Sequence, residues 1–298
     1  MTAAEGDGRP KVGCVVLTTG ERSDELAAAL GSVRAQRDVE IVTVVVLNAG
    51  PGFAVPDVGD ARLLTPGRNL GIPAGRNLGV EALVEQGEHD LVLFLDDDGE
   101  LLGDDVLARA SRLFTRFPRL AVVSLRIVDP ATGRTVRRHV PRLRVGDPGR
   151  SSWVTTFLGG ASIHRVDAFR DVGGLPEEFW YAHEETSLAW RLLDRGWRIA
   201  YAGALCMSHP ATPPARHATY HHRTARNRVL LARRHLPAVL GVLYVGLWSV
   251  LGLLRAPEGR REALAGILEG WRMDGVERAP IRWRTVAVML MEGRPPLL

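Results

Sequence analysis

The residues most suited to chemistry are three consecutive aspartates, Asp96, Asp97 and Asp98, which follow the apolar run 91–95. An uninterrupted apolar run of this kind is typical of a strand buried on both faces. In open α/β sheets, ligands bind beyond the carboxyl ends of the strands, where these three carboxylates would lie. Because like charges repel unless a cation joins them, and oxygen ligands suit Mg²⁺ or Mn²⁺, we expect a metal–diphosphate site. The alternative is a solvated acidic turn.

A second acidic group, Glu184 and Glu185, leads into a helical pattern. Repulsion between adjacent carboxylates raises the pKa of one of them, which favours proton acceptance near neutral pH. We therefore expect Glu185 to be a general base for an attacking hydroxyl, with Glu184 as the second choice. The alternative is a helix N-terminus whose glutamates complement the helix dipole.

A histidine, His209, follows a later strand pattern and is a candidate further metal ligand through its neutral imidazole. A single histidine is weak support for a metal site, so a loop histidine without a ligand role is the alternative.

The elements that must position these residues alternate between strand and helix patterns, which predicts a doubly wound, mostly parallel α/β sheet. The first strand is not followed by GxGxxG, so a dinucleotide site is not supported. We expect strands at 12–19, 40–47, 62–64, 91–95, 120–128 and 197–202, helices from 23, from about 74, at 104–117 and from 185, a hairpin turn at 129–133, a loop at 141–152 and a proline-broken loop after His209.

The whole chain has 298 residues, a net charge of +4 and a single lysine, Lys11, so its basicity comes almost entirely from arginine. Cys14 and Cys206 form no CxxC motif, which favours a reducing compartment. The polar N-terminus lacks the apolar core of a signal peptide. We expect a cytoplasmic protein, either free or at the inner face of the cell membrane, and no nucleic-acid partner.

The C-terminal region contains an uncharged run at 236–254, bracketed by Arg233, Arg234 and Arg255. Nineteen uncharged residues are long enough to span a bilayer, although Pro237 and several glycines weaken that reading. Three alternatives remain open: peripheral membrane association, burial against the rest of the chain, and a true span. We expect a flexible segment at 1–10, a catalytic domain at 11–230 and a helical extension at 231–298.

Taken in order, these motifs resemble the inverting family 2 glycosyltransferases of the rhamnosyl- and galactosyltransferase type, which have the GT-A fold. The resemblance covers about residues 11–230 and rests on motif order rather than on any single motif. The matching residues are Thr19 and Arg22, then Asn69, Gly71, Gly75, Arg76 and Asn77, then Phe94 to Asp98, then Gly159, Gly160 and Ala161, then Gly173 and Gly174, then Glu184, Glu185, Leu188 and Arg191, then His209, and finally Arg226 and Asn227.

This resemblance implies a role for each candidate residue. Asp98 would be the direct metal ligand, while Asp96 would contact the nucleotide ribose or a metal-bound water. The other implied donor or nucleotide contacts are Thr19, Arg22, Asn48, Arg76, Asp97, Gly160 and Arg226. The alternatives are local: a helix-start contact for Arg22, a surface position for Arg76, a packing glycine at Gly160 and a solvated basic helix face around Arg226.

The chain also departs from the family pattern. Thr18 and Gly20 replace a proline and an aromatic residue, and Leu47 or Asn48 stands where an aspartate often contacts the base and ribose. Glu185 and Ser187 replace two aspartates of the catalytic helix. These departures leave the nucleotide open but keep the expected metal site and base.

The expected function is metal-dependent transfer of one sugar, with inversion, from a nucleotide-diphosphate sugar to an acceptor hydroxyl. The acceptor would be a lipid-linked or cell-envelope glycan, or a small molecule such as a secondary metabolite. Arg282-Trp283 lacks the glutamine of the processive QxxRW motif, which favours transfer of a single sugar. The alternatives are a sugar-phosphate nucleotidyltransferase, which needs no acidic doublet on a later helix, and a non-catalytic nucleotide-sugar-binding protein.

Overall fold

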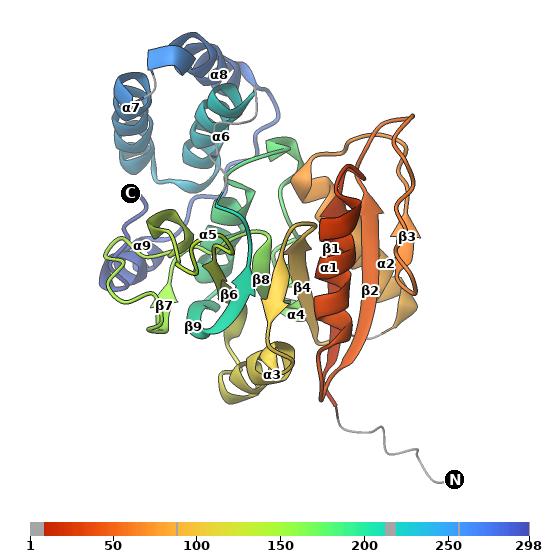
Figure 1. The fold of residues 1–298 in the computed structure, drawn as a ribbon. Coiled ribbons are helices and arrows are strands. Elements are labelled where there is room, and N and C mark those ends of the chain that lie inside the picture. The colour runs from red at the N-terminus through yellow and green to blue at the C-terminus, as the bar shows by residue number, and fades with distance from the viewer. Residues whose placement is uncertain (1–8, 88, 212–218, 256, 298) are drawn as a thin grey trace.

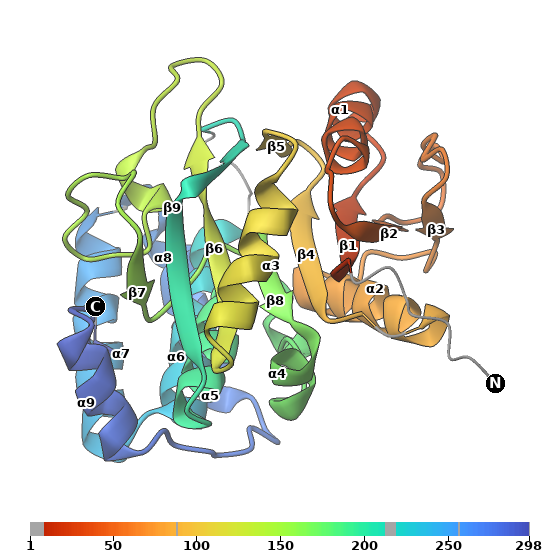
Figure 2. The same cartoon turned by 90° about the horizontal axis from the view of Figure 1, so that it is seen from below.

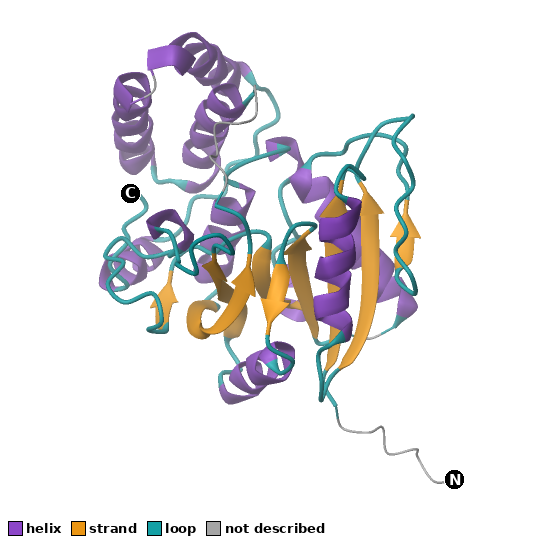
Figure 3. Cartoon of the chain, viewed as in Figure 1, coloured by secondary structure: helices purple, strands orange, loops and turns teal. Residues whose placement is uncertain are grey.

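The computed structural model describes residues 9–87, 89–211, 219–255 and 257–297, and these fold into a nine-stranded sheet flanked by helices (Figures 1 and 3). Most of the expected N-terminal segment 1–10 and of the expected loop after His209 lies outside the described residues. The strands are β1 (Lys11–Thr18), β2 (Glu40–Leu47), β3 (Arg62–Leu64), β4 (Leu91–Asp96), β5 (Glu100–Leu102), β6 (Leu120–Val128), β7 (Ser152–Val154), β8 (Ala161–Arg165) and β9 (Arg198–Ser208).

The strand order is β3-β2-β1-β4-β8-β6-β9-β5, with β7 paired to β9. Strand β1 is parallel to β2 and β4, β2 is parallel to β3, and β6 is parallel to β9. Strand β8 lies antiparallel between β4 and β6, while β5 and β7 pair antiparallel with β9. The predicted α/β class with a mostly parallel sheet is confirmed. The antiparallel pairing of β5, β7 and β8 was not predicted from the alternation of strand and helix patterns.

Helices cover both faces of the sheet because successive side chains of each strand point to opposite sides. On β1, Cys14 faces the layer formed by α1 and α3, whereas Val15 faces the layer that contains α2, α4 and α5 (Figure 2). Both layers are clusters of buried apolar side chains, which explains why the central strands are continuous apolar runs in the sequence. The helix bounds are α1 (Ser23–Arg34), α2 (Ile72–Gln86), α3 (Val106–Arg116), α4 (Val166–Asp171) and α5 (Glu184–Asp194), with short 3₁₀ turns η1 (Arg137–His139) and η2 (Glu177–Phe179).

Most of the predicted elements are confirmed, and the differences lie at their ends. The last strand, expected at 197–202, continues to Ser208 as β9 and so brings His209 to the sheet edge. The expected hairpin turn at 129–133 is a turn closed by a single bridge between Asp129 and Arg134, not a two-stranded hairpin. The expected loop before β7 has no helix or strand within 141–151.

The C-terminal part is helical, as predicted. It comprises α6 (Tyr220–His235), α7 (Ala238–Arg255), η4 (Pro257–Gly259), α8 (Arg260–Arg272) and α9 (Trp283–Met291), and α6, α7 and α8 form a group beside the sheet (Figure 1).

Helix α7 is long and apolar enough to cross a membrane by length and composition, with a mean hydropathy of 1.8. Only 6% of this helix is buried. Its inner side packs Tyr244, Val245 and Trp248 against the core, while Val242 and Leu254 are exposed. Of the three alternatives for this segment, burial against the rest of the chain therefore applies to one side of the helix alone.

Candidate active site

The candidate site lies at one edge of the sheet, where several parallel strands end. Strands β1, β2 and β4 run in the same direction, and two successive antiparallel pairings through β8 give β6 and β9 that direction as well. The carboxyl ends of β1, β2, β4 and β9 carry Thr18, Asn48, Asp96 and His209, respectively. This edge is where α/β sheets bind their ligands.

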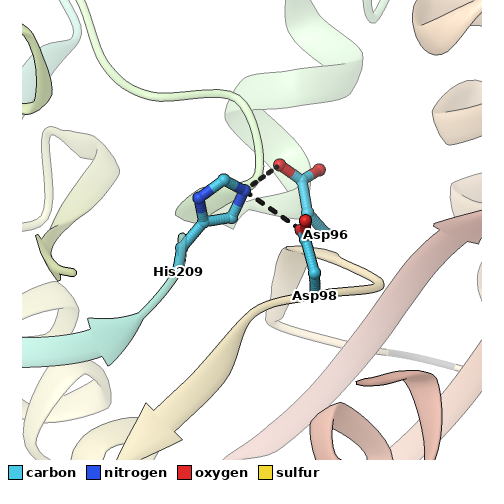
Figure 4. Close-up of side chains that lie close together, drawn as sticks. All are labelled: Asp96, Asp98 and His209. Carbon is cyan, nitrogen blue, oxygen red and sulfur yellow. Dashed lines mark ion pairs between the residues drawn. The ribbon is translucent and has the colours of Figure 1, made fainter. Parts of the chain in front are cut away.

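Asp96, Asp98 and His209 converge at this edge (Figure 4). Nε2 of His209 lies 3.1 Å from Oδ1 of Asp98 and 3.7 Å from Oδ2 of Asp96, and the three candidate ligand atoms lie within 4.8 Å of one another. Two carboxylate oxygens and an imidazole nitrogen at this spacing fit a divalent ion such as Mn²⁺ or Mg²⁺ after small side-chain adjustments. All three predicted metal ligands are thus brought together.

The electrostatics of this triad follow from its charges. Burial opposes ionisation of both Asp98 and His209, but their mutual hydrogen bond and the nearby charges outweigh it. The pKa of Asp98 is therefore lowered and the pKa of His209 is raised. Asp98 is held ready as a carboxylate, and binding of a metal would release the proton from His209.

The middle aspartate turns away from this cluster. Oδ2 of Asp97 accepts a 2.7 Å hydrogen bond from Thr18, and Oδ1 accepts one of 3.1 Å from Arg22, which also donates to Asp98 at 2.5 Å. Burial raises the pKa of Asp97, although Thr18 and Arg22 act in the opposite direction. Asp97 and Arg22 thus fix the loop that presents Asp98. The sequence did not indicate the contact between Thr18 and Asp97.

Arg76 links the metal cluster to the acidic pair. Its side chain is buried, lies 5.5 Å from the centre of the Phe94 ring, and donates a 2.9 Å hydrogen bond to Oδ1 of Asp96. The surface position considered for Arg76 is therefore wrong. Arg76 also favours the ionised forms of Glu184 and Glu185.

The acidic pair forms the first turn of α5. Glu184 is buried and its Oε2 has no hydrogen-bond partner among the described residues, whereas Glu185 is half-buried. Burial is the main cause that raises the pKa of each carboxyl, and the charge of Glu185 raises that of Glu184 further. A carboxylate with a raised pKa that still reaches solvent is suited to accept a proton, which fits Glu185 better than Glu184.

The glycine doublet Gly159-Gly160 lets these groups approach one another. A Cβ on Gly160 would lie 2.0 Å from the carboxyl group of Asp96, and a Cβ on Gly159 would lie 2.6 Å from Nη1 of Arg76 and 2.8 Å from Oε1 of Glu185. Neither position has room for a side chain without displacing a site residue.

Two further predicted residues have local partners. Asn48 is buried and holds the loop before α2, since its side chain accepts from Leu70 N at 2.7 Å and donates to Gly71 O at 3.0 Å. The hydroxyl of Thr19 donates to Glu21 at the surface. Donor contacts by Thr19 and Asn48 stay predictions.

Arg226 and its neighbour Asn227 support the backbone that leads into α5. Arg226 donates to the carbonyl oxygens of Glu178 and Phe179, each at 2.9 Å, and also pairs with Glu269. Asn227 donates to the carbonyl oxygens of Phe179, Tyr181 and Ala182 at 3.0, 2.7 and 2.7 Å. The adjacent pair Arg226 and Asn227 was recognisable in the sequence, but the contacts of this pair with the loop could not be predicted from the sequence.

This loop is strained. Trp180, Ala182 and His183 all have positive φ angles, of 59°, 68° and 68°. Such angles are uncommon for residues other than glycine and persist where the surroundings enforce them, often at functional sites. The bonds from Arg226 and Asn227 supply that enforcement directly before Glu184.

No family model matches this chain, and no curated protein matches it in sequence. Solved structures do match its fold. TarS of S. aureus has a TM-score of 0.52 at 17% identity, over 74% of this chain and 39% of the TarS chain. The mannosyltransferase PcManGT from Pyrobaculum calidifontis, solved with GDP-Man and Mn²⁺, has a TM-score of 0.56 at 15% identity, over 95% of this chain and 79% of PcManGT.

GalNAc-T7, solved with UDP, GalNAc and Mn²⁺, has a TM-score of 0.58 at 11% identity, over 88% of this chain and 55% of its own. This chain therefore matches well under two thirds of the length of TarS and of GalNAc-T7. At these identities the likeness establishes the fold, which is the GT-A fold of glycosyltransferases.

Proposed function

We propose that this chain is a metal-dependent, inverting glycosyltransferase of the family 2 type that transfers one sugar from a nucleotide-diphosphate sugar to an acceptor hydroxyl. The observation that carries the proposal is the pairing of two clusters on a GT-A fold. Asp96, Asp98 and His209 form a candidate metal site, and Arg76 connects it to the glutamates at the start of α5.

The residues divide the reaction between them. Asp98, Asp96 and His209 would hold Mn²⁺ or Mg²⁺, which supplies Lewis-acid stabilisation to the departing diphosphate. Arg76 orients Asp96 through their hydrogen bond. The absence of side chains at Gly159 and Gly160 lets Asp96, Arg76 and Glu185 lie against this backbone, beside which the donor sugar would bind.

Glu185 is the proposed general base. The acceptor oxygen forms a bond to the anomeric carbon from the face opposite the diphosphate, and the bond from that carbon to the diphosphate oxygen breaks with its electron pair on the leaving group. The hydroxyl proton passes to the carboxylate of Glu185. Attack from the opposite face inverts the anomeric configuration.

We further propose a cytoplasmic protein that contacts an anionic membrane surface through the exposed side of α7. Val239, Val242 and Val250 are exposed along this helix, at 68%, 70% and 57%. Exposed Arg255 and Arg261 lie at its end and in the next helix. An apolar stripe beside cations is the arrangement of a helix that lies in a membrane interface.

Vesicle sedimentation tests this contact. The chain should sediment with anionic vesicles and remain in solution with neutral ones at moderate salt. Val242→Asp should release it from the anionic vesicles, while Thr115→Asp, a polar position on α3, should not. Equal sedimentation of both variants with wild type would contradict the role of α7.

Donor turnover tests the proposed function. Purified protein is incubated with UDP-, dTDP- and GDP-sugars in the presence of Mn²⁺, Mg²⁺ or a chelator, and released nucleoside diphosphate is measured. We expect metal-dependent release from one donor class and its loss in Asp98→Ala but not in Asp60→Ala, an exposed carboxylate paired with Arg34. Pyrophosphate release from a nucleoside triphosphate and a sugar phosphate would indicate a nucleotidyltransferase instead. Donor binding without turnover, even with acceptor lipids added, would indicate a binding protein.

A further inference from the structure

Two cavities lie among and beside the C-terminal helices. The first, of about 210 Å³, lies between α6, α7 and α8 and has a largely apolar wall that includes Val245, Leu251 and Ile267. The second, of about 90 Å³, lies between His183 and Thr186 at the start of α5, Thr155 and Thr156 after β7, and the C-terminal segment near Arg294. Arg228 and Trp248 line both cavities, so their side chains form the wall that the two cavities share, here called the junction.

The junction is cationic. The guanidinium carbon of Arg228 lies 3.9 Å from the centre of the Trp248 ring, and Tyr244 is its hydrogen-bonding neighbour. No aspartate or glutamate is among the described residues that line either cavity. Partial removal of a charge from water without an opposite charge is unfavourable, so an anionic ligand would restore the balance.

Unpartnered polar atoms point to the same conclusion. Within the described part of the chain, Nε of Arg228, Oγ1 of Thr224 and Nε2 of His183 are enclosed and have no hydrogen-bond partner. Thr224 lines the first cavity, His183 the second and Arg228 both. Buried polar atoms are normally hydrogen-bonded, so three of them around two neighbouring cavities indicate a site for a ligand with a polar group.

Arg228 differs from the arginine two positions earlier. Arg226 is fully engaged by backbone carbonyls and by Glu269, which gives it a structural role. Arg228 has no carboxylate among the groups that shift its pKa, which burial lowers. Of the two, Arg228 is therefore the one available to an external anion.

The second cavity lies beside the first turn of α5, the helix that carries the proposed general base. His183 immediately precedes the acidic pair Glu184 and Glu185, and Thr156 lies three residues before Gly159, whose Cβ would meet Glu185. His183 and Thr186 line this cavity but neither glutamate does, so the cavity lies beside the first turn of α5 and not at the carboxyl group of Glu185 itself.

We propose that the acceptor is an anionic amphiphile. Its phosphate or carboxylate group binds Arg228 at the junction, its apolar part occupies the cavity between α6, α7 and α8, and its hydroxyl reaches toward Glu185. The inference rests on the proposed transferase function, of which it names the acceptor class. The exposed apolar side of α7 lies opposite the side that lines the cavity, which fits an acceptor drawn from a lipid surface.

Calorimetric binding of octyl phosphate, below its micellar concentration, tests the proposal. Octyl glucoside supplies the same chain without the charge, and inorganic phosphate supplies the charge without the chain. We expect octyl phosphate to bind at least about tenfold more tightly than either, a difference of about 1.4 kcal/mol. Equal binding of octyl phosphate and octyl glucoside would overturn the anion site, and binding to vesicles alone would overturn the cavity.

Amino-acid substitutions test which residues bind octyl phosphate. Arg228→Gln should weaken octyl phosphate about tenfold or more without changing octyl glucoside binding, while Arg228→Lys should retain part of the affinity. Ile267→Trp, which fills the first cavity, should weaken binding with Arg228 still in place. Arg272→Gln, at an exposed arginine on α8, is the matched control and should bind as wild type. An equal loss in Arg272→Gln, or no loss in Arg228→Gln, would contradict the proposal.

Metal-dependent donor release, measured on the same preparations, separates the two proposals. If donor is turned over but octyl phosphate does not depend on Arg228, the acceptor inference alone is wrong. If octyl phosphate binds as expected but no donor is turned over, the binding site for an anionic amphiphile is supported and the transferase function is wrong.

Discussion

Arg76 donates a 2.9 Å hydrogen bond from Nη2 to Oδ1 of Asp96, and this contact connects the two acidic clusters of the chain. One oxygen of Asp96 faces this guanidinium while the other faces His209. The same guanidinium favours the ionised forms of Glu184 and Glu185. A shift of Asp96 on binding of a metal or donor would therefore change the electrostatic environment of Glu185, the proposed base, through the buried side chain of Arg76.

Replacement of the proposed base should lower the rate of sugar transfer and leave the binding of donor and metal intact. Glu185→Gln should lower kcat by about 10²–10⁴-fold with little change in affinity for donor and metal, because the amide keeps the shape but cannot accept the proton. Steady-state kinetics and donor calorimetry measure the two effects. A full loss in Glu184→Gln with normal turnover in Glu185→Gln would assign the base to Glu184.

The activity should fall with acid at a higher pH than an ordinary glutamate would give. Burial raises the pKa of Glu185, and the base works only when ionised. Activity is therefore present above the raised pKa and is lost as pH falls through it. A kcat profile from about pH 4 to pH 9 measures this, and a profile that stays flat down to the pKa of a free glutamate, about 4.3, would contradict the role of Glu185.

Glu184 should lower the stability of the free protein at high pH. Burial raises its pKa, so its contribution to stability is fully present below the unfolded pKa and is lost as pH rises through the folded pKa. Glu184→Gln removes this titration. The Tm of the variant should exceed that of wild type at pH 8, and the difference should close toward pH 4. Thermal unfolding in chelator measures both, and a constant difference across this range would contradict the prediction.

A methyl group at Gly160 should damage the metal site. The Cβ would meet the carboxyl group of Asp96 at 2.0 Å, so the aspartate must move. Gly160→Ala should weaken Mn²⁺ binding by about 10-fold or more, a typical effect of disturbing a metal ligand through its neighbours.

The matched control is Gly31→Ala. A Cβ at Gly31, within α1, meets nothing within 4 Å, so the change should leave Mn²⁺ binding unchanged and stabilise the helix slightly. Wild-type Mn²⁺ affinity in Gly160→Ala would show that Asp96 is not needed at its present position.

Asn227 should act on catalysis without touching the metal. Asn227→Ala removes three hydrogen bonds to the strained segment before α5 and leaves those carbonyl oxygens with fewer partners. We expect a loss of stability of about 1–3 kcal/mol and a lower kcat, with Mn²⁺ affinity unchanged. Denaturant unfolding, kinetics and metal titration measure the three quantities. Unchanged kcat in a folded variant would mean that the strained loop does not position the base.

Sequence patterns identified the residues of the candidate site because those residues lie where strands and helices begin or end. The run into Asp96 identifies β4, and its carboxylates must lie at the sheet edge by the geometry of any parallel strand. His209 could be placed at the same edge only in the structure, because two antiparallel pairings through β8 determine the direction of β9.

Contacts between distant segments could not be predicted in this way. The partner of Asp97 is Thr18, 79 residues earlier, and the carbonyls bound by Asn227 lie 45 to 48 residues earlier. Local patterns carry no information on such pairs. Arg76 illustrates the same limit, since a polar residue on a helix gave no sign that it would be buried beside Phe94.

Electron paramagnetic resonance of Mn²⁺ tests most directly the central claim that Asp96, Asp98 and His209 form one metal site. Wild-type protein with UDP or GDP should bind Mn²⁺, and Asp98→Ala and His209→Ala should both weaken binding, while Asp60→Ala should not. A bound spectrum that is unchanged in Asp98→Ala would contradict the account.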